Sequence, residues 1–184
     1  MLLIGWVLIV LAVIFVIMLL SYYNRFAVLA NRIDNSLSQI DVQLKRRADL
    51  IPNLLETVKG YAKHEKAIME AVTKARSAMI SAKDLPSKMK ANNVLEGALG
   101  KLFAIAEGYP DLKANTNFLE LQKELSATED RVAYSRQFYN DSILSYNNMC
   151  KTFPGNVFAG IFGRKEKEYL KIAEVDRKLP KVEF

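Results

Sequence analysis

The chain has a single cysteine, Cys150, and a single histidine, His64. One cysteine cannot form a disulfide within the chain, which agrees with a reducing compartment. One histidine cannot supply the histidine pair of a zinc-protease helix, and no second histidine follows His64-Glu65. The sequence also has no glycine-rich phosphate loop and no dinucleotide fingerprint. With only 5 prolines and 8 glycines among 184 residues, long helices meet few residues that would break them.

Positive charge is only in modest excess, because the chain has 26 Lys and Arg residues and 20 Asp and Glu residues, which gives a net charge of +6. That excess fits a protein beside an anionic membrane leaflet as well as one that binds nucleic acid. The basic triplet Lys45-Arg46-Arg47 spreads over most of a helical circumference, so it cannot form one phosphate clamp. We interpret the triplet as salt-bridged surface, the alternative being a nucleotide or nucleic-acid contact. A nucleic-acid partner is not expected.

What the sequence does have is an unbroken apolar run over residues 2–20. At about 1.5 Å per residue, a helix of that length just crosses a hydrocarbon core of about 30 Å. The membrane-spanning residues are therefore expected to extend from Leu2 past Trp6 to Leu20, with Tyr22 and Tyr23 at the second interface. The alternative is a cleaved signal peptide, which would need a basic start, a shorter run and a small-residue cleavage site. We expect a retained transmembrane anchor over residues 1–23.

The basic residues around the anchor predict its orientation. None precedes the apolar run, whereas Arg25 and Arg32 follow it closely. Basic residues near a membrane span favour the cytoplasmic side. The N-terminus is thus expected outside, and the rest of the chain in the cytoplasm.

Beyond the anchor, apolar residues recur every three or four positions and predict an all-α domain over 24–153. Four helices are expected, over 24–59, 64–83, 88–108 and 112–153. Pro52 should bend the first helix without reversing it, so that Gly60 marks the first true turn. The long first and fourth helices then run back along one another, which brings residues 26–33 to residues 143–153. The predicted fold is an antiparallel four-helix bundle with long helices 1 and 4.

The periodicity also predicts which residues of each helix face the core. On the first helix the apolar stripe includes Leu37 and Leu55, and on the third it includes either Val94 or Leu95. The stripe of the fourth helix carries hydroxyls at 128, 135 and 142, where a neighbouring helix can approach closely. Ser87 is the expected N-cap of the third helix.

Catalytic chemistry is not indicated by these placements. A nucleophile–base pair of Cys150 and His64 would need to lie within hydrogen-bond reach. The predicted lengths place the two about 50–60 Å apart at 1.5 Å per residue. We interpret Cys150 as a small buried residue and His64 as a turn or helix-cap residue. The acidic residues of the fourth helix have no histidine with which to build a metal site in the bundle core. No catalytic residue, metal or cofactor is therefore predicted, and the protein is not expected to be an enzyme.

The segment FPGNVFAGIFG, residues 153–163, is unusually apolar for a solvated connection, and basic residues follow it directly. Its apolar side chains either cap the open end of the bundle or enter the membrane interface or a neighbouring subunit, with the basic residues at anionic headgroups. The candidate contact residues are Phe158, Ile161, Phe162, Arg164 and Lys165. The region 154–184 as a whole is expected to form an apolar loop, a short helix and a tail.

Several motifs follow one another in a distinctive order: DVQLKRR from Asp41, DLIPNL from Asp49, ETVKGYAKHE from Glu56, FPGN from Phe153 and LPKVEF from Leu179. Together they resemble the LemA family of bacterial membrane proteins over nearly the whole chain. The resemblance implies a single-pass protein of the bacterial cytoplasmic membrane with a helical bundle. It implies no activity and no site residues, because the family has no established catalytic function. One class of members, in magnetosome-forming bacteria, is tied to membrane shaping.

These observations lead to a hypothesis of function with two alternatives. The hypothesis is a membrane-anchored, non-enzymatic helical scaffold whose partners are the lipid bilayer and further copies of itself. The first alternative is an adaptor that presents a groove to another protein in signalling or membrane-protein quality control. The second is an uncharacterised enzyme, which would require a pocket that gathers several titratable groups.

Overall fold

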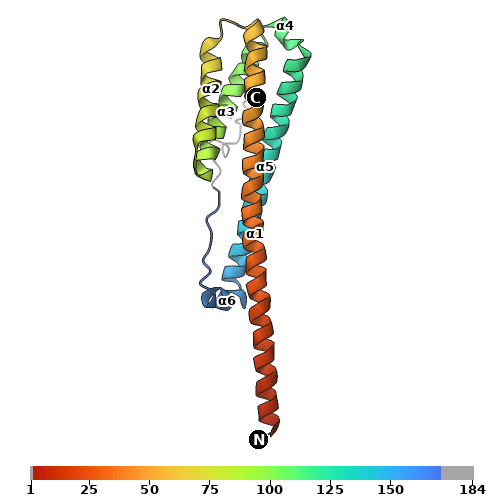
Figure 1. Ribbon diagram of the computed structural model, residues 1–184, viewed down its shortest axis with the longest axis vertical. Helices are drawn as coiled ribbons and strands as arrows, with labels where there is room; N and C mark the ends of the chain where they lie inside the picture. Colours follow the sequence, from red (N-terminus) through yellow and green to blue (C-terminus); the bar gives the residue numbers. More distant parts are fainter. Residues whose placement is uncertain (1, 171–184) are drawn as a thin grey trace, which may run out of the picture. The chain divides into compact units, whose positions relative to one another are not determined.

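The computed structural model describes residues 2–170, which contain helices and connections but no strand. The helices are α1 (Leu2–Tyr61), α2 (Lys66–Ser81), α3 (Leu85–Ala106), α4 (Pro110–Lys113), α5 (Thr116–Lys151) and α6 (Gly155–Ile161) (Figure 1). The all-α fold predicted from the sequence is confirmed. The tail beyond residue 170, with the motif LPKVEF, lies outside the described residues, and the division at 23 and 153 stays a prediction.

The chain forms two compact units, and both α1 and α5 contribute to each of them. Of the described residues, unit 1 comprises 2–38 and 136–169, and unit 2 comprises 39–135 and Leu170. Within unit 2, α2 and α3 pack side by side (Figure 1). Helix α1 continues through Pro52 and ends at Tyr61, so the first turn is beside Gly60, as predicted.

Helix α3 begins earlier than its sequence suggests. Asp84 is the N-cap, and its carboxylate accepts a hydrogen bond from the Ser87 backbone N–H at 2.9 Å. The prediction that Ser87 caps the helix was wrong, because Pro86 belongs to the first turn. Proline is tolerated there, since the N–H that it lacks has no partner within the helix.

The buried residues of unit 2 are mostly those of the predicted apolar stripes, with a few differences. Leu95 is buried, whereas Val94 is exposed, which decides the alternative left open on α3. On α1, Leu54 is buried and Leu55 only half-buried. The largest difference is Arg47, a charged residue that is only 1% exposed.

The interpretation of the basic triplet as surface is therefore wrong for Arg47 alone. Its guanidinium donates to Asn92 Oδ1 at 3.0 Å and lies 3.6 Å from Glu129. Burial lowers the pKa of Arg47, and the charges of Glu129 and Glu96 oppose that shift. The other two members of the triplet form surface ion pairs, Lys45 with Asp49 at 3.5 Å and Arg46 with Glu124 at 2.9 Å.

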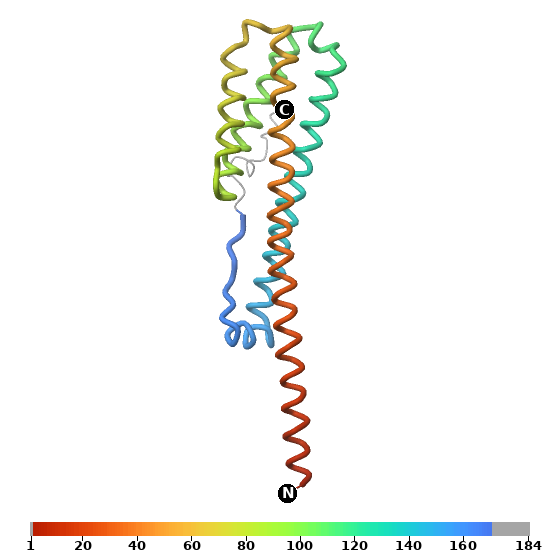
Figure 2. Tube along the Cα trace, in the orientation of Figure 1, coloured from red at the N-terminus to blue at the C-terminus, as the bar shows by residue number. Residues whose placement is uncertain are grey.

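Unit 1 joins the N-terminal part of α1 to the C-terminal end of α5. Phe26 and Ile33 of α1 pack with Ile143, Tyr146 and Met149 of α5 in one buried cluster, so the predicted contact of 26–33 with 143–153 is confirmed. After α6 the chain turns back in an extended stretch over 164–169 (Figure 2).

Candidate membrane-proximal site

The apolar start of α1 is exposed along nearly its whole length, with Leu19 half-buried against the cluster of unit 1. Among the described residues, α1 is the one helix long and apolar enough to cross a membrane, and none of its apolar window is buried. Leu2 is 85% exposed, Trp6 67% and Leu20 56%. A helix that is apolar all round and unburied needs an apolar medium around it.

The segment 153–163 forms a short helix, α6, that packs against the end of this apolar run. The ring of Phe158 stacks on that of Tyr22 with centroids 4.6 Å apart, and lies 6.3 Å from that of Phe15. Phe162 meets Tyr23 edge to face at 5.4 Å. These contacts place α6 beside the last turns of the apolar run.

The two faces of α6 differ in what they contact. Phe158 is buried in the cluster of unit 1 and Phe162 is half-buried against it. The exposed stripe of α6 consists of Val157 and Ile161, which are one turn apart and 50% and 54% exposed; Phe153, in the turn before α6, is 83% exposed. Of the candidate contact residues, Ile161 and Lys165 are therefore exposed, Arg164 is half-buried, and Phe158 lies inside the unit. The sequence analysis missed the exposed stripe, although its spacing of four residues was a readable signal.

Close backbone packing and paired polar groups hold α6 and the stretch after it against α5. A Cβ at position 155 would collide with the carbonyl oxygen of Met149, so Gly155 permits an approach that no other residue allows. The Asn147 side chain donates to the Lys167 carbonyl and accepts from the Lys167 N–H, both at 2.8 Å. Lys151 pairs with Glu166 at 2.8 Å.

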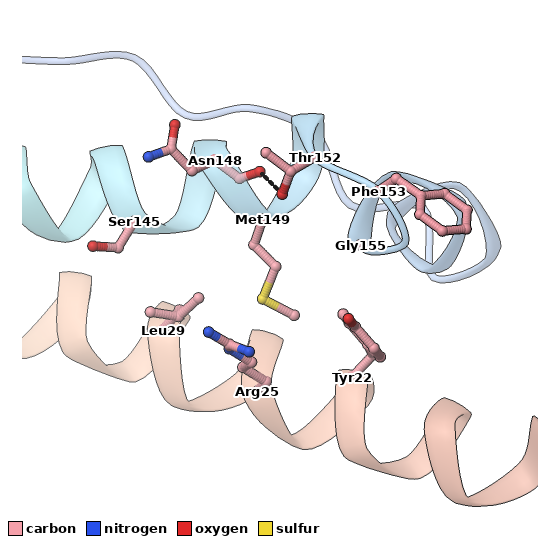
Figure 3. A pocket seen from close by; sticks show the side chains of 9 residues that line it. All are labelled: Tyr22, Arg25, Leu29, Ser145, Asn148, Met149, Thr152, Phe153 and Gly155. Atoms are coloured by element: carbon pink, nitrogen blue, oxygen red, sulfur yellow. Dashed lines mark hydrogen bonds between the residues drawn. The ribbon is translucent and has the colours of Figure 1, made fainter. Parts of the chain in front are cut away.

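A pocket of about 310 Å³ lies in unit 1 between α1 and α5, next to the turn that precedes α6. Figure 3 shows the guanidinium of Arg25 directed from α1 toward α5, with the Met149 side chain reaching down between Arg25 and Tyr22. The lining residues are Tyr22, Arg25 and Leu29 from α1, Ser145, Asn148, Met149 and Thr152 on the α5 side, Phe153 before α6 and Gly155 at its start. None of the nine is acidic. The sequence analysis used Arg25 only for orientation and did not identify this pocket, since its far wall comes from α5.

The residues considered for catalysis lie in different surroundings. His64 is in the turn between α1 and α2, as expected. Cys150 is half-buried, and burial first, then Glu166, raises the pKa of its thiol, while Arg164 opposes the shift. The thiol is thus held in its protonated, weakly nucleophilic form. Within residues 2–170, no three His, Cys, Asp or Glu side chains are grouped so as to hold a metal ion.

A comparison with protein families matches residues 36–184 to the LemA family. The chain belongs to the LemA family. Magnetosome protein MamQ 2 of Paramagnetospirillum magneticum is 27% identical over 181 residues, covering 84% of this chain and 66% of the relative. Protein LemA of Metamycoplasma hominis is 27% identical over 148 residues, covering 80% of this chain and 68% of the relative. The chain thus spans slightly less than two thirds of the length of the MamQ relative.

Proposed function

We propose that this LemA-family protein is a membrane-anchored, non-enzymatic helical scaffold that self-associates in the plane of the bilayer. The stacking of Phe158 on Tyr22 carries the proposal, because Tyr22 lies just beyond the apolar run. If residues 2–20 cross the bilayer, α6 lies at the surface where the anchor leaves it. An exposed apolar stripe at that depth suits the boundary between headgroups and acyl chains.

A second membrane contact beside the anchor would restrict how unit 1 tilts against the bilayer. Copies that share one tilt present the same surfaces to one another, as closed or repeating assemblies require. The unburied apolar helix offers a further surface for packing between copies. Such an assembly would organise the membrane that holds it, in keeping with the magnetosome proteins among its relatives. Arg25 and Arg32 favour an orientation in which the residues beyond the anchor lie on the cytoplasmic side of the membrane.

Lipid contact by α6 is testable with tryptophan, because Trp6 is the only one in the chain. In a Trp6→Phe background, Val157→Trp should be strongly quenched by brominated lipids in vesicles. Tyr134→Trp is the matched control: it is exposed on α5, roughly 25 Å along the helix from Lys151. Adding Phe153→Ser and Ile161→Ser should reduce the quenching of the tryptophan introduced at position 157 while the protein remains in the membrane. Equal quenching at positions 157 and 134 would contradict the placement of α6.

Self-association is measured separately, by the mass of the full chain in mild detergent. A discrete homo-oligomer that shrinks when Phe153 and Ile161 are changed to Ser supports a scaffold whose packing depends on α6. A monomer at all concentrations overturns the scaffold. A monomer bound in fixed ratio to one defined protein favours the adaptor.

A further inference from the structure

We propose that the pocket between α1 and α5 in unit 1 binds the phosphate of an anionic phospholipid headgroup, with Arg25 as the residue that recognises the charge. The inference rests on the proposed membrane anchor and goes beyond it, because it assigns a lipid class and a binding site. The occupant is a phosphodiester whose headgroup carries hydroxyls, as in phosphatidylglycerol.

Among the described residues, Arg25 has no protein partner, in contrast to three other cations of unit 1. Lys151 pairs with Glu166, while the guanidinium of Arg32 and the ammonium of Lys167 lie over the rings of Phe138 and Tyr146. Within the described part of the chain, Arg25 has no hydrogen bond, ion pair or ring contact. A guanidinium directed at a wall without an acidic side chain is suited to an anion, and its planar fork matches two phosphate oxygens.

The depth of Arg25 agrees with a headgroup phosphate. It follows Leu20 by five residues, which is about 7.5 Å along a helix. The headgroup region on each side of a bilayer is about 5–7.5 Å thick, if the hydrocarbon core is about 30 Å and the whole bilayer about 40–45 Å. Arg25 therefore lies at the outer edge of the headgroup region once residues 2–20 span the core.

The remaining polar groups of the pocket suit a headgroup with hydroxyls. The hydroxyl hydrogens of Ser145 and Thr152 are donated to the backbone carbonyls of Asp141 and Asn148, both at 2.8 Å. These oxygens therefore offer lone pairs, which accept hydrogen bonds from a glycerol headgroup. On the apolar side, Phe153 lines the pocket and is 83% exposed in the turn before α6, so one lipid can contact Arg25 and Phe153 together.

The experiment measures lipid binding to the purified full chain in detergent by native mass spectrometry, with short-chain phosphatidylglycerol and phosphatidylcholine. We expect one saturable phosphatidylglycerol per chain and weaker binding of phosphatidylcholine. Arg25→Gln should lower the affinity about tenfold, the ratio that corresponds to about 1.4 kcal/mol. Arg25 is exposed, so the helical circular dichroism should not change.

Lys165→Gln is the matched control, because it removes one exposed positive charge of unit 1 outside the pocket. An equal loss in Arg25→Gln and Lys165→Gln would overturn the site and leave only general electrostatic attraction. Displacement of the lipid by glycerol phosphate at equal concentration would overturn the lipid as the occupant. A second measurement separates this proposal from the proposed function. The tryptophan introduced by Val157→Trp is quenched with brominated lipids in chains with and without Arg25→Gln. Its quenching should be the same in both, because loss of the headgroup site leaves the contact of α6 with lipid unchanged.

Discussion

The hydroxyl oxygens of Ser36 and Ser142 lie 3.2 Å apart, where α1 and α5 meet in unit 1. Both side chains are fully buried, and each donates to a carbonyl of its own helix, Ser36 to Arg32 at 2.6 Å and Ser142 to Phe138 at 2.7 Å. Small side chains whose hydroxyls are satisfied by their own helices allow two helices to approach closely without leaving a polar group unpaired.

Enlarging this contact should therefore destabilise the protein. We expect Ser142→Leu to lower the free energy of unfolding by about 1–3 kcal/mol, because a close-packed contact has no room for the added methyl groups. Ser38→Leu, on the exposed side of α1, should change it by less than about 0.5 kcal/mol. Denaturant unfolding of the full chain in detergent measures both, and a similar effect of the two changes would contradict the close contact.

The sequence predicted much of this helix pairing, but not which residues meet. The hydroxyls at 128, 135 and 142 are buried as expected, at 0%, 9% and 0% exposed. On α1 the apolar stripe selected Leu37, whereas Ser36 fills the contact. Hydropathy counts apolar residues and cannot recognise a buried serine whose hydroxyl is satisfied by a carbonyl of its own helix. Arg47 was missed for a different reason, because its partners Asn92 and Glu129 belong to α3 and α5.

The membrane-proximal site was predictable only in part. The apolar run, the aromatic residues at its end and the apolar segment near α6 are visible in the composition. Which face of α6 is buried depends on the close approach of Gly155 to the Met149 carbonyl and on the fit of Phe158 against Tyr22. The pocket around Arg25 likewise needs α5 as its second wall, and no pattern local to α1 reveals it.

Two adjacent arginines should respond very differently to truncation. Arg47→Ala should destabilise the protein by about 2–5 kcal/mol, because it opens a cavity and leaves buried Asn92 without its partner. Arg46→Ala removes an exposed pair with Glu124 and should cost less than about 1 kcal/mol. Arg47→Met should fall between them, since it retains most of the packed volume. Thermal unfolding followed by circular dichroism provides the ranking, and equal shifts for Arg46→Ala and Arg47→Ala would show that Arg47 is not buried in solution.

The N-cap of α3 should give a pH dependence in the acidic range. The hydrogen bonds from Ser87 lower the pKa of Asp84 below its ordinary value of 3.8. Because the folded pKa is below the unfolded one, the stabilisation is present above the unfolded value and is lost as the pH falls through the folded value. Asp84→Asn keeps a side-chain acceptor that does not titrate. The difference in unfolding midpoint between the unaltered chain and Asp84→Asn should thus be constant above about pH 5 and change only below about pH 4. A difference that varies between pH 6 and pH 8 would have another origin.

The orientation of the anchor is the prediction on which the cytoplasmic placement depends. In a Cys150→Ala background, Lys101→Cys provides an exposed thiol on α3. A membrane-impermeant maleimide should label residue 101 in inverted membrane vesicles and not in right-side-out vesicles. The physical reason is that Arg25 and Arg32 resist transfer across the bilayer during insertion, so the side that carries them stays in the cytoplasm. The reverse labelling pattern would show that these two arginines do not set the topology. It would also place the pocket of Arg25 in the outer leaflet, where the same lipid could be bound but no cytoplasmic partner could reach the residues beyond the anchor.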